Sequence, residues 1–371
     1  MRADYVMVGG FLGAGKTSLL LRLADRLTGE GRRVGLITND QSLGLVDTTL
    51  LRSHGYPVRE ITGGCFCCRF TSLVEAAEQL TDDAKPDVLL AEPVGSCTDL
   101  RATVQYPLRR LYGDDYRIAP LSVLVDPIRA LRVLGVERGQ AFSPQVRYVY
   151  GKQLEEAEII VINKADLLTP DRQAQLERAL ASACPDAELH VVSTRTGAGL
   201  DRWCERVAGR ESDSRRTPAL DYDAYADGEA RLGWFNATFR LEAARPFDGN
   251  AFLGELVVGV AHRLATASVE IAHLKMALTP DESLGDLAVM NLVGGDRSPE
   301  LSHRLRSELS SGELVVNARG EGEPDALRDA VHEVLAQVAH RLAVTTVVVH
   351  AESFRPARPT PTYRITSTES T

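Results

Sequence analysis

A glycine-rich segment near the start of the chain has the residue types of a phosphate site. Gly10-Phe-Leu-Gly13-Ala14-Gly15-Lys16-Thr17 fits the pattern G-x-x-x-x-G-K-[ST]. Glycines let successive backbone N–H groups face phosphate oxygens, the lysine reaches the β- and γ-phosphates, and the threonine hydroxyl can ligate Mg²⁺. The predicted triphosphate-binding residues are Gly10, Gly13, Ala14, Gly15, Lys16, Thr17 and the following Ser18.

A second motif indicates which base is bound. Asn163-Lys164-Ala165-Asp166 follows an apolar run, and in this spacing Asp166 can accept the N1 and N2 protons of guanine while the lysine stem covers a ring face. Ser193 and Thr194, after the next apolar run, would bring a backbone amide to the guanine carbonyl. The motif favours GTP over ATP, and a helix-capping turn is the alternative explanation.

An acidic residue is expected where another strand approaches the γ-phosphate. Glu92-Pro93-Val94-Gly95 follows the apolar run that ends at residue 91. Glu92 would hold a magnesium-bound water or the attacking water, and the Gly95 N–H would bind the γ-phosphate. Lys16 and Glu92 are therefore the predicted catalytic residues, although Glu92 alone would also suit a strand-end cap.

Three thiols lie within four residues in Cys65-Phe66-Cys67-Cys68, directly after two glycines. Thiolates at this density suit Zn²⁺ or another thiophilic divalent ion. Three ligands are one short of a closed tetrahedral site, so the fourth is water, a nucleotide-coupled ligand, or Cys97. An apolar cluster and a redox pair formed by Cys67 and Cys68 are the competing explanations.

The elements that must position these motifs follow from the apolar pattern. Up to about residue 208, short apolar runs alternate with helical patterns, which is typical of a mostly parallel, doubly wound α/β sheet. The predicted strands are Tyr5–Gly9, Arg33–Thr38, Asp87–Ala91, Leu121–Asp126, Ile159–Asn163 and Leu189–Ser193. The predicted helices are Lys16–Leu27, Ser72–Leu80, Asp171–Ala183 and Leu200–Ala208.

The rest of the chain predicts a linker, a smaller domain and a tail. Residues 209–233 are polar and sustain no helical or strand period, and residues 354–371 are rich in Pro, Ser and Thr, so a flexible tail is expected. Between them, residues 234–353 predict an α+β domain with two β-α-β halves on one sheet. Its elements are Trp234–Leu241, Asn250–Ala265, Val269–Leu278, Leu287–Val293, Gly312–Ala318, Pro324–Leu342 and Thr345–Ala351.

Composition narrows the class of protein. The 371 residues carry 42 Lys+Arg and 51 Asp+Glu, a net charge of −9, and 44% are hydrophobic. An acidic chain without a dense basic block is a poor partner for nucleic acid or an anionic membrane. No run approaches the roughly 18 apolar residues of a membrane helix, and Met1-Arg2-Ala3-Asp4 does not begin a signal peptide. A cytoplasmic location is therefore expected, and six cysteines are too few for a disulfide scaffold.

With these motifs in place, the first 208 residues resemble the CobW-type metal-associated P-loop GTPases, the group that also contains UreG, HypB and MeaB. The resemblance rests on the phosphate loop, Glu92-x-x-Gly95, Asn163-Lys164-x-Asp166 and, most specifically, Cys65-x-Cys67-Cys68. It implies hydrolysis of GTP to GDP and phosphate, coupled to delivery of zinc or cobalt to a client metalloenzyme. Asp47 matches a family acid, which implies a catalytic role for it.

The sequence departs from the family after the second predicted strand. Asn39-Asp40-Gln41-Ser42 stands where relatives carry Asn-Glu-Phe-Gly, so a divergent member with its own client is indicated. Kinship suggests a cobalamin or corrinoid protein as client, and P-loop switches of this kind often act as homodimers. The alternative function is a GTP-driven conformational chaperone of such an enzyme without metal cargo. A phosphotransferase is disfavoured because no Arg-rich lid is evident.

Overall fold

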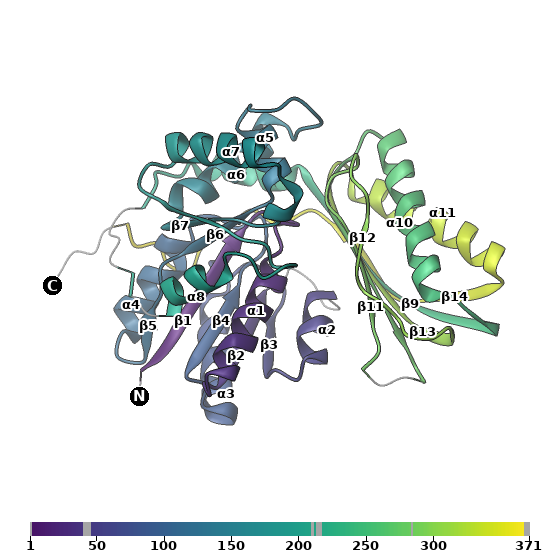
Figure 1. The fold of residues 1–371 in the computed structure, drawn as a ribbon, viewed down its shortest axis with the longest axis horizontal. Helices are drawn as coiled ribbons and strands as arrows, with labels where there is room; N and C mark the ends of the chain where they lie inside the picture. Colours follow the sequence, from purple (N-terminus) through teal and green to yellow (C-terminus); the bar gives the residue numbers. More distant parts are fainter. Residues whose placement is uncertain (1, 40–45, 209–210, 213–216, 283–284, 367–371) are drawn as a thin grey trace. The chain divides into compact units, whose positions relative to one another are not determined.

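A computed structural model gives the fold of the chain, and it describes residues 2–39, 46–208, 211–212, 217–282 and 285–366 (Figure 1). The chain divides into two compact units. Unit 1 comprises Met1–Gln41, His54–Gly228 and Arg358–Thr371, and unit 2 comprises Ser42–Ser53 and Glu229–Ala357.

Unit 1 is built on a parallel sheet with strand order β3-β2-β4-β1-β6-β7-β8, and β5 also pairs with β1. Four of its strands, β2, β4, β6 and β7, are buried along their whole length and β1 is buried from Asp4 onward, as expected when helices cover both faces. The strands are β1 (Ala3–Gly10), β2 (Val34–Asn39), β3 (Val58–Ile61), β4 (Val88–Glu92), β5 (Tyr116–Ile118), β6 (Ser122–Val125), β7 (Ile159–Ile162) and β8 (Glu188–Val191).

Helices connect these strands. α1 packs on β1, β2 and β4, α3 packs on β2 and β3, and α6 and α8 pack on β1. The helices of this region are α1 (Lys16–Gly29), α3 (Phe70–Ala84), α4 (Tyr106–Tyr112), α5 (Pro127–Val133), α6 (Pro144–Glu156), α7 (Pro170–Ala183), α8 (Leu200–Ala208) and α9 (Tyr222–Ala230). A π-helical turn, Arg101–Gln105, precedes α4, and a 3₁₀ turn, Ala165–Leu167, follows β7.

The predicted fold class is confirmed, and each of the six strands predicted before residue 208 is present within two residues of its expected bounds. The short strands β3 and β5 and the helices α2 (Val46–Ser53), α4, α5 and α6 were not predicted. Three helices begin with the same local signal, because Asp126, Ser143 and Thr169 each cap a helix whose first residue is proline.

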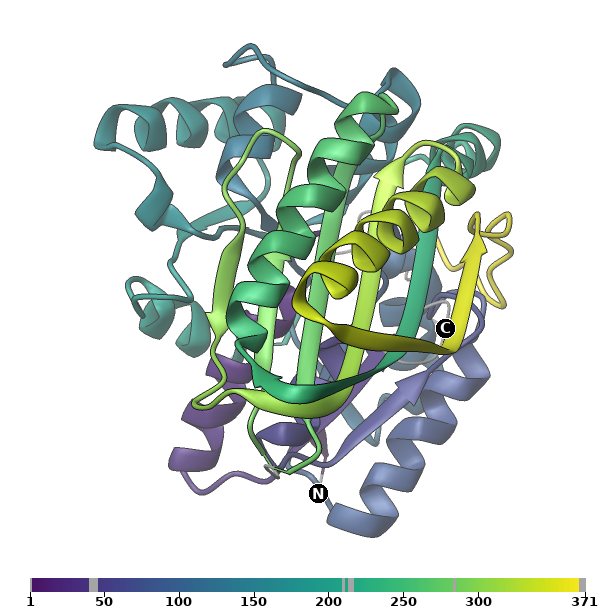
Figure 2. The ribbon, with the colours of Figure 1, turned by 90° about the vertical axis from the view of Figure 1, so that its right-hand side faces the viewer.

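Unit 2 contains an antiparallel sheet of order β12-β11-β10-β13-β9-β14, with α10 and α11 on one face (Figure 2). The connections β9-α10-β10 and β13-α11-β14 are the two predicted β-α-β halves, and β13 lies between β9 and β10. The elements are α2 (Val46–Ser53), β9 (Leu232–Phe247), α10 (Gly249–Thr266), β10 (Glu270–Pro280), β11 (Ala288–Leu292), β12 (Glu300–His303), β13 (Leu309–Glu321), α11 (Pro324–Leu342) and β14 (Val344–Phe354).

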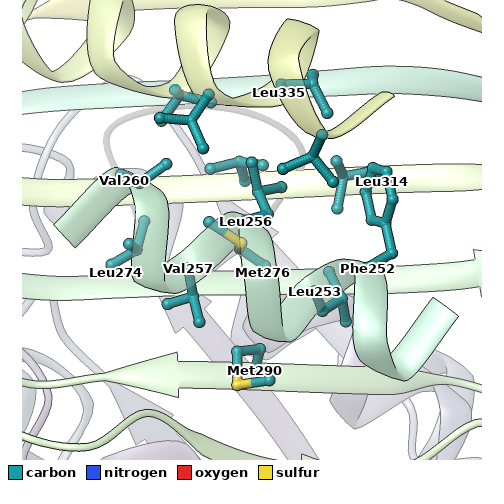
Figure 3. Packing of buried hydrophobic residues seen from close by; sticks show 14 of the residues in the cluster. Phe252, Leu253, Leu256, Val257, Val260, Leu274, Met276, Met290, Leu314 and Leu335 are labelled. Carbon is teal, nitrogen blue, oxygen red and sulfur yellow. The ribbon is translucent and has the colours of Figure 1, made fainter. Parts of the chain in front are cut away.

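The core of unit 2 lies between its sheet and its two long helices. Figure 3 shows Leu253, Leu256 and Val260 of α10 directed toward the sheet, where Met276 belongs to β10, and Leu335 comes from α11. These side chains are buried. The burial of these apolar side chains on folding stabilises the packing of α10 and α11 on the sheet.

Two segments are more ordered than their composition predicts. The expected linker contains α9, and Tyr225 of this helix is buried, with its hydroxyl oxygen accepting the Thr98 N–H at 3.3 Å. In the expected flexible tail, the Ile365 N–H donates to Ala102 O at 2.8 Å. Both segments find hydrogen-bond partners far away in the sequence, which composition cannot reveal.

Among the helices that the structure describes, we find none whose length and apolar character would allow it to cross a membrane.

Candidate nucleotide and metal site

The phosphate loop joins the end of β1 to the start of α1, the context that its motif requires. Gly10, Gly13 and Gly15 all have positive φ. A Cβ on Gly10 would lie 2.4 Å from Leu124 O, and one on Gly15 would lie 2.5 Å from Asn163 Nδ2. Positive φ at all three positions, and the close approach of backbone atoms at Gly10, explain why this path favours glycine.

Lys16, Thr17 and Glu92 are buried together beside the loop. Lys16 Nζ donates to Gly10 O at 3.0 Å and lies 3.9 Å from Glu92 Oε1. The Thr17 hydroxyl donates to the same Glu92 oxygen at 3.1 Å. An ammonium, a hydroxyl and a carboxylate at the N-terminus of α1 form a donor set that suits a triphosphate with Mg²⁺. Ser18 lies in the first turn of α1 and is exposed.

The segment after β4 packs closely against the phosphate loop. A Cβ on Gly95 would lie 2.7 Å from Leu12 Cδ2 and 3.0 Å from Leu12 N. The buried Gln153 side chain donates to both Gly95 O at 2.9 Å and Cys97 O at 2.8 Å. Residues 92–97 are therefore fixed between the phosphate loop and α6.

Two residues that were not singled out from the sequence support the loop from the other side. The Arg129 guanidinium donates to Leu12 O and lies over the Phe11 ring, 5.4 Å from its centroid. Asp126, at the end of β6, accepts the Arg129 N–H at 3.1 Å and the Lys164 ammonium at 2.9 Å. The Asp-Pro pair that begins α5 was the sequence signal for Asp126.

The Asn163-Lys164-Ala165-Asp166 segment follows β7, at the same edge of the sheet. Asn163 is buried, and its amide donates to Ala14 O at 2.9 Å and accepts the Thr194 N–H at 3.2 Å. Lys164 donates to Gly13 O at 2.7 Å. These contacts tie the phosphate loop to the segment after β8, so Asn163 has a positioning role in addition to any contact with a base.

The Asp166 carboxylate lies beside that same segment. Its Oδ1 accepts the Ser193 hydroxyl at 2.6 Å, and its Oδ2 lies 3.3 Å from Arg195 Nη1. The structure thus brings Asn163, Lys164, Asp166, Ser193 and Thr194 together as the sequence predicts. Their contact with a nucleotide stays a prediction.

The three clustered thiols converge after β3. Cys65 Sγ lies 2.8 Å from Cys67 Sγ and 3.2 Å from Cys68 Sγ, and all three sulfurs lie within 4.8 Å of one another. Cys65 and Cys67 are buried, whereas Cys68 is half-buried. The compact arrangement can place three sulfurs around one metal ion.

Asn39, the last residue of β2, holds the cysteine loop in place. Its Nδ2 donates to Ile61 O at 3.0 Å and to Gly64 O at 2.7 Å, and its Oδ1 accepts the Phe66 N–H at 2.9 Å. Gly63 and Gly64 have positive φ, which lets the chain turn before the first thiol. Every hydrogen on Nδ2 is therefore used to position this loop.

The thiols differ in proton affinity. Hydrogen bonds with Cys67, Cys68 and Cys97 lower the pKa of Cys65 well below its usual value. The hydrogen bond with Cys65 raises the pKa of Cys67, and it is also the main cause that raises the pKa of Cys68 to about 11. Cys97, which is buried, is thus close enough to interact with Cys65.

Asp47 is the third predicted catalytic residue. It belongs to α2 in unit 2, where its carboxylate pairs with Lys275 of β10. Its catalytic role stays a prediction, and this ion pair gives it a structural role. Asp40, Gln41 and Ser42, which replace the usual family residues, lie outside the described residues.

Comparison with known proteins decides the family. A family model described as "CobW/HypB/UreG, nucleotide-binding domain" matches residues 4–191, half of the chain. The chain belongs to the CobW/HypB/UreG family. The predicted resemblance is therefore confirmed, and the matched residues include the phosphate loop, the cysteine cluster and Asp166.

Two proteins to which the chain is similar have names that refer to zinc. The zinc chaperone YeiR of Escherichia coli (strain K12) is 30% identical over 173 residues, 46% of this chain and 49% of that protein. The zinc-regulated GTPase metalloprotein activator 1 of Dictyostelium discoideum is 24% identical over 213 residues, 49% of this chain and 44% of that protein. The chain thus spans about half the length of these relatives.

Among solved structures, HypB from Helicobacter pylori in complex with nickel is 19% identical, with a TM-score of 0.42. The match covers 57% of this chain and 91% of that one.

Proposed function

We propose that this member of the CobW/HypB/UreG family is a GTP-hydrolysing metallochaperone that carries Zn²⁺, or another thiophilic ion such as Co²⁺, on Cys65, Cys67 and Cys68. The observation that carries the proposal is the convergence of three sulfurs within 4.8 Å in the same unit as the phosphate loop. The names of the zinc-chaperone relatives support zinc as the cargo.

The nucleotide would be held at the carboxyl edge of the parallel sheet. The phosphate-loop amides and Lys16 would bind the phosphates, Thr17 would ligate Mg²⁺, and Glu92 would hold a water on the metal or the attacking water. The Gly95 N–H would sense the γ-phosphate. Bound Mg²⁺ would neutralise charge that develops on the phosphates during hydrolysis.

Asp166 is the proposed base-reading residue. Its carboxylate accepts hydrogen bonds only, which matches the N1 and N2 protons of guanine and does not match the adenine edge. The Asp166→Asn variant places an N–H donor at this position, so it should lose affinity for GTP and gain affinity for xanthosine triphosphate, which carries a carbonyl at C2. Unchanged affinity for both nucleotides would show that Asp166 does not read the base.

Cys97 is the proposed fourth ligand of the cargo ion. It lies two residues after Gly95, and its interaction with Cys65 supports the proposal. The group of sulfurs within 4.8 Å of one another consists of Cys65, Cys67 and Cys68, so Cys97 would have to move closer to join it. Four thiolates would close a tetrahedral zinc site. We therefore expect Cys97→Ser to bind zinc more weakly than the parent chain and to leave one position open for exchange.

Nucleotide state and metal affinity would be coupled through residues 92–97. Loss of the γ-phosphate would release Glu92 and Gly95, and Gln153 would transmit the movement because it holds the Gly95 and Cys97 carbonyls together. Such coupling is reciprocal and commonly amounts to about 1–3 kcal/mol, or roughly 5–150-fold in affinity. The client would be a metalloenzyme, with a cobalamin or corrinoid protein as one hypothesis.

Metal analysis of the purified chain tests the cargo role. Zinc affinity is measured by competition with a chromophoric chelator, with a non-hydrolysable GTP analogue, with GDP and without nucleotide. We expect affinities that differ at least fivefold between nucleotide states. Replacing Cys65, Cys67 and Cys68 with serine should abolish binding, whereas Cys184→Ser, which alters a buried thiol elsewhere in unit 1, should not.

Gln153→Ala separates coupling from binding. This variant retains the thiols and the phosphate loop, so it should bind zinc and GTP while the difference between nucleotide states shrinks. Equal zinc affinity in all three states of the unmodified chain would overturn the coupling and leave a metal-binding protein without a nucleotide switch.

A further inference from the structure

The C-terminal segment 358–366 runs across the cysteine cluster within unit 1. The Thr360 N–H donates to Cys68 Sγ at 3.2 Å, and the Thr362 N–H donates to Cys67 O at 2.9 Å. The Thr362 hydroxyl donates to Cys68 O at 3.2 Å. The contacts lie at Cys67 and Cys68, and Cys68 is the most exposed of the three clustered thiols.

The sequence of the segment suits this position. In residues 359–362, Pro359 and Pro361 have no backbone N–H, and both remaining amides, those of Thr360 and Thr362, donate to the cluster. Proline also restricts the backbone to extended conformations. Both amides of this stretch are used, one on the Cys68 thiol and one on the Cys67 carbonyl, which is a specific arrangement rather than a random tail.

Side chains farther along anchor the segment. The Arg364 guanidinium donates to Asp99 Oδ2 at 2.7 Å, and the Tyr222 hydroxyl donates to the same oxygen at 2.7 Å. The Tyr363 ring packs edge-on against the buried Phe70 ring, with 5.3 Å between the centroids. Asp99 is buried and has positive φ, so the fold holds an acceptor where Arg364 arrives.

Most side chains of the segment are nevertheless exposed, although Pro359 is buried. Arg358, Thr360, Thr362 and Arg364 are exposed, and Tyr363 is 43% exposed. A segment whose side chains are mostly exposed opens at a lower free-energy cost than the buried strands of unit 1. It can therefore leave the cluster without unfolding unit 1.

We propose that residues 358–366 form a displaceable cap over the Cys65-Cys67-Cys68 cluster, and that the strip formed by Cys67, Cys68, Phe70 and Asp99 is a peptide-binding surface occupied by the chain's own C-terminal segment. The cap shields Cys68, the thiol through which an acceptor would reach a bound ion. The consequence for metal transfer rests on the proposed metallochaperone function, but the cap itself does not.

Thiol labelling of the metal-free, reduced protein tests the cap. Iodoacetamide modification of each cysteine is followed by peptide mass spectrometry. In the Tyr363→Ala/Arg364→Ala variant, modification of Cys68 should accelerate roughly tenfold, because two anchors of a locally opening segment are lost. Arg355→Ala is the matched control, since Arg355 lies before the cap and pairs with Glu323.

Three further measurements keep the result unambiguous. Slow modification of the buried Cys184 and Cys204 in the double variant shows that unit 1 remains folded. The single variant Arg364→Lys, which preserves the charge beside Asp99, should keep most of the protection of Cys68 from iodoacetamide. A synthetic peptide of residues 356–366, added in excess to the double variant, should slow the modification of Cys68 again.

Equal Cys68 modification rates in the unmodified chain and in the folded double variant would overturn the cap. In zinc-loaded protein, transfer to a chelator should accelerate in the double variant by a similar factor. If Cys68 labelling responds but the chain holds no zinc, the cap stands and the metallochaperone function fails. If zinc is held and neither labelling nor transfer changes, the function stands and the cap fails.

Discussion

Asn39 offers the sharpest test of how the fold positions the cysteine cluster. Its side chain makes three hydrogen bonds, to Ile61 O, Gly64 O and the Phe66 N–H, at 3.0, 2.7 and 2.9 Å. Asn39→Ala removes all three and leaves buried backbone groups without these partners. At about 1 kcal/mol for each bond, the loss is about 3 kcal/mol of unfolding free energy.

This loss should be visible in both stability and metal affinity. For a domain of roughly 150–250 residues, 1 kcal/mol shifts the Tm by about 2–4 °C, so unit 1 should unfold about 6–12 °C lower. Groups that orient metal ligands typically contribute about 10–100-fold to metal affinity. We therefore expect Asn39→Ala to weaken zinc binding by that factor in chelator competition.

Asn250 provides a matched control in unit 2. Its amide donates to Leu305 O at 3.1 Å and accepts the Leu305 N–H at 3.0 Å, far from the thiols in the sequence. Asn250→Ala should lower the Tm without changing zinc affinity. If Asn39→Ala behaves in the same way, with a lower Tm and unchanged zinc affinity, the reasoning that Asn39 sets the ligand geometry is refuted.

Three other substitutions test individual residues of the two units. Burial raises the pKa of Glu156, at the end of α6, from 4.5 to about 8, so the folded state keeps a proton that the unfolded state releases. The free energy of unfolding should therefore fall by up to about 5 kcal/mol as the pH rises from 4.5 to 8. Glu156→Gln should remove this pH dependence in urea unfolding. Gly95→Ala forces a Cβ to 3.0 Å from Leu12 N and should weaken binding of a fluorescent GTP analogue about tenfold; unchanged binding would contradict the close packing of this segment on the phosphate loop. Asp47→Asn breaks the pair with Lys275 and should lower stability by about 1–3 kcal/mol; lost GTP hydrolysis with unchanged unfolding would instead support the catalytic role implied by the family.

Local signals explain what the sequence predicted well. The strands of unit 1 are continuous apolar runs, and their carboxyl ends carry Lys16, Glu92 and Asp166 at one edge of a parallel sheet. Because this topology places strand ends together, motif order along the chain was sufficient to predict which residues meet. The cysteine cluster was predictable because its three members lie within four residues.

Long-range partners explain what the sequence could not predict. Asn39 is adjacent to no cysteine in the sequence, and Asp99 meets Arg364 across 265 residues. Neither pairing has a local pattern. The helices α5 and α6 were not predicted for another reason, because the apolar periodicity of each is short or weak. The pairs Asp126-Pro127 and Ser143-Pro144 nevertheless marked the first turns of these helices.

The segment after β4 connects features that would otherwise be separate. Glu92 accepts the Thr17 hydroxyl beside the phosphate loop, and Cys97 interacts with Cys65. Asp99, two residues farther on, receives the Arg364 anchor of the cap. Glu92, Cys97 and Asp99 are thus separated by only a few residues of one segment, which links the phosphate loop to the thiols and to the cap. Because Gln153 donates to both the Gly95 and Cys97 carbonyls, the proposed coupling and the proposed cap together predict that nucleotide state, metal affinity and cap opening change as one event.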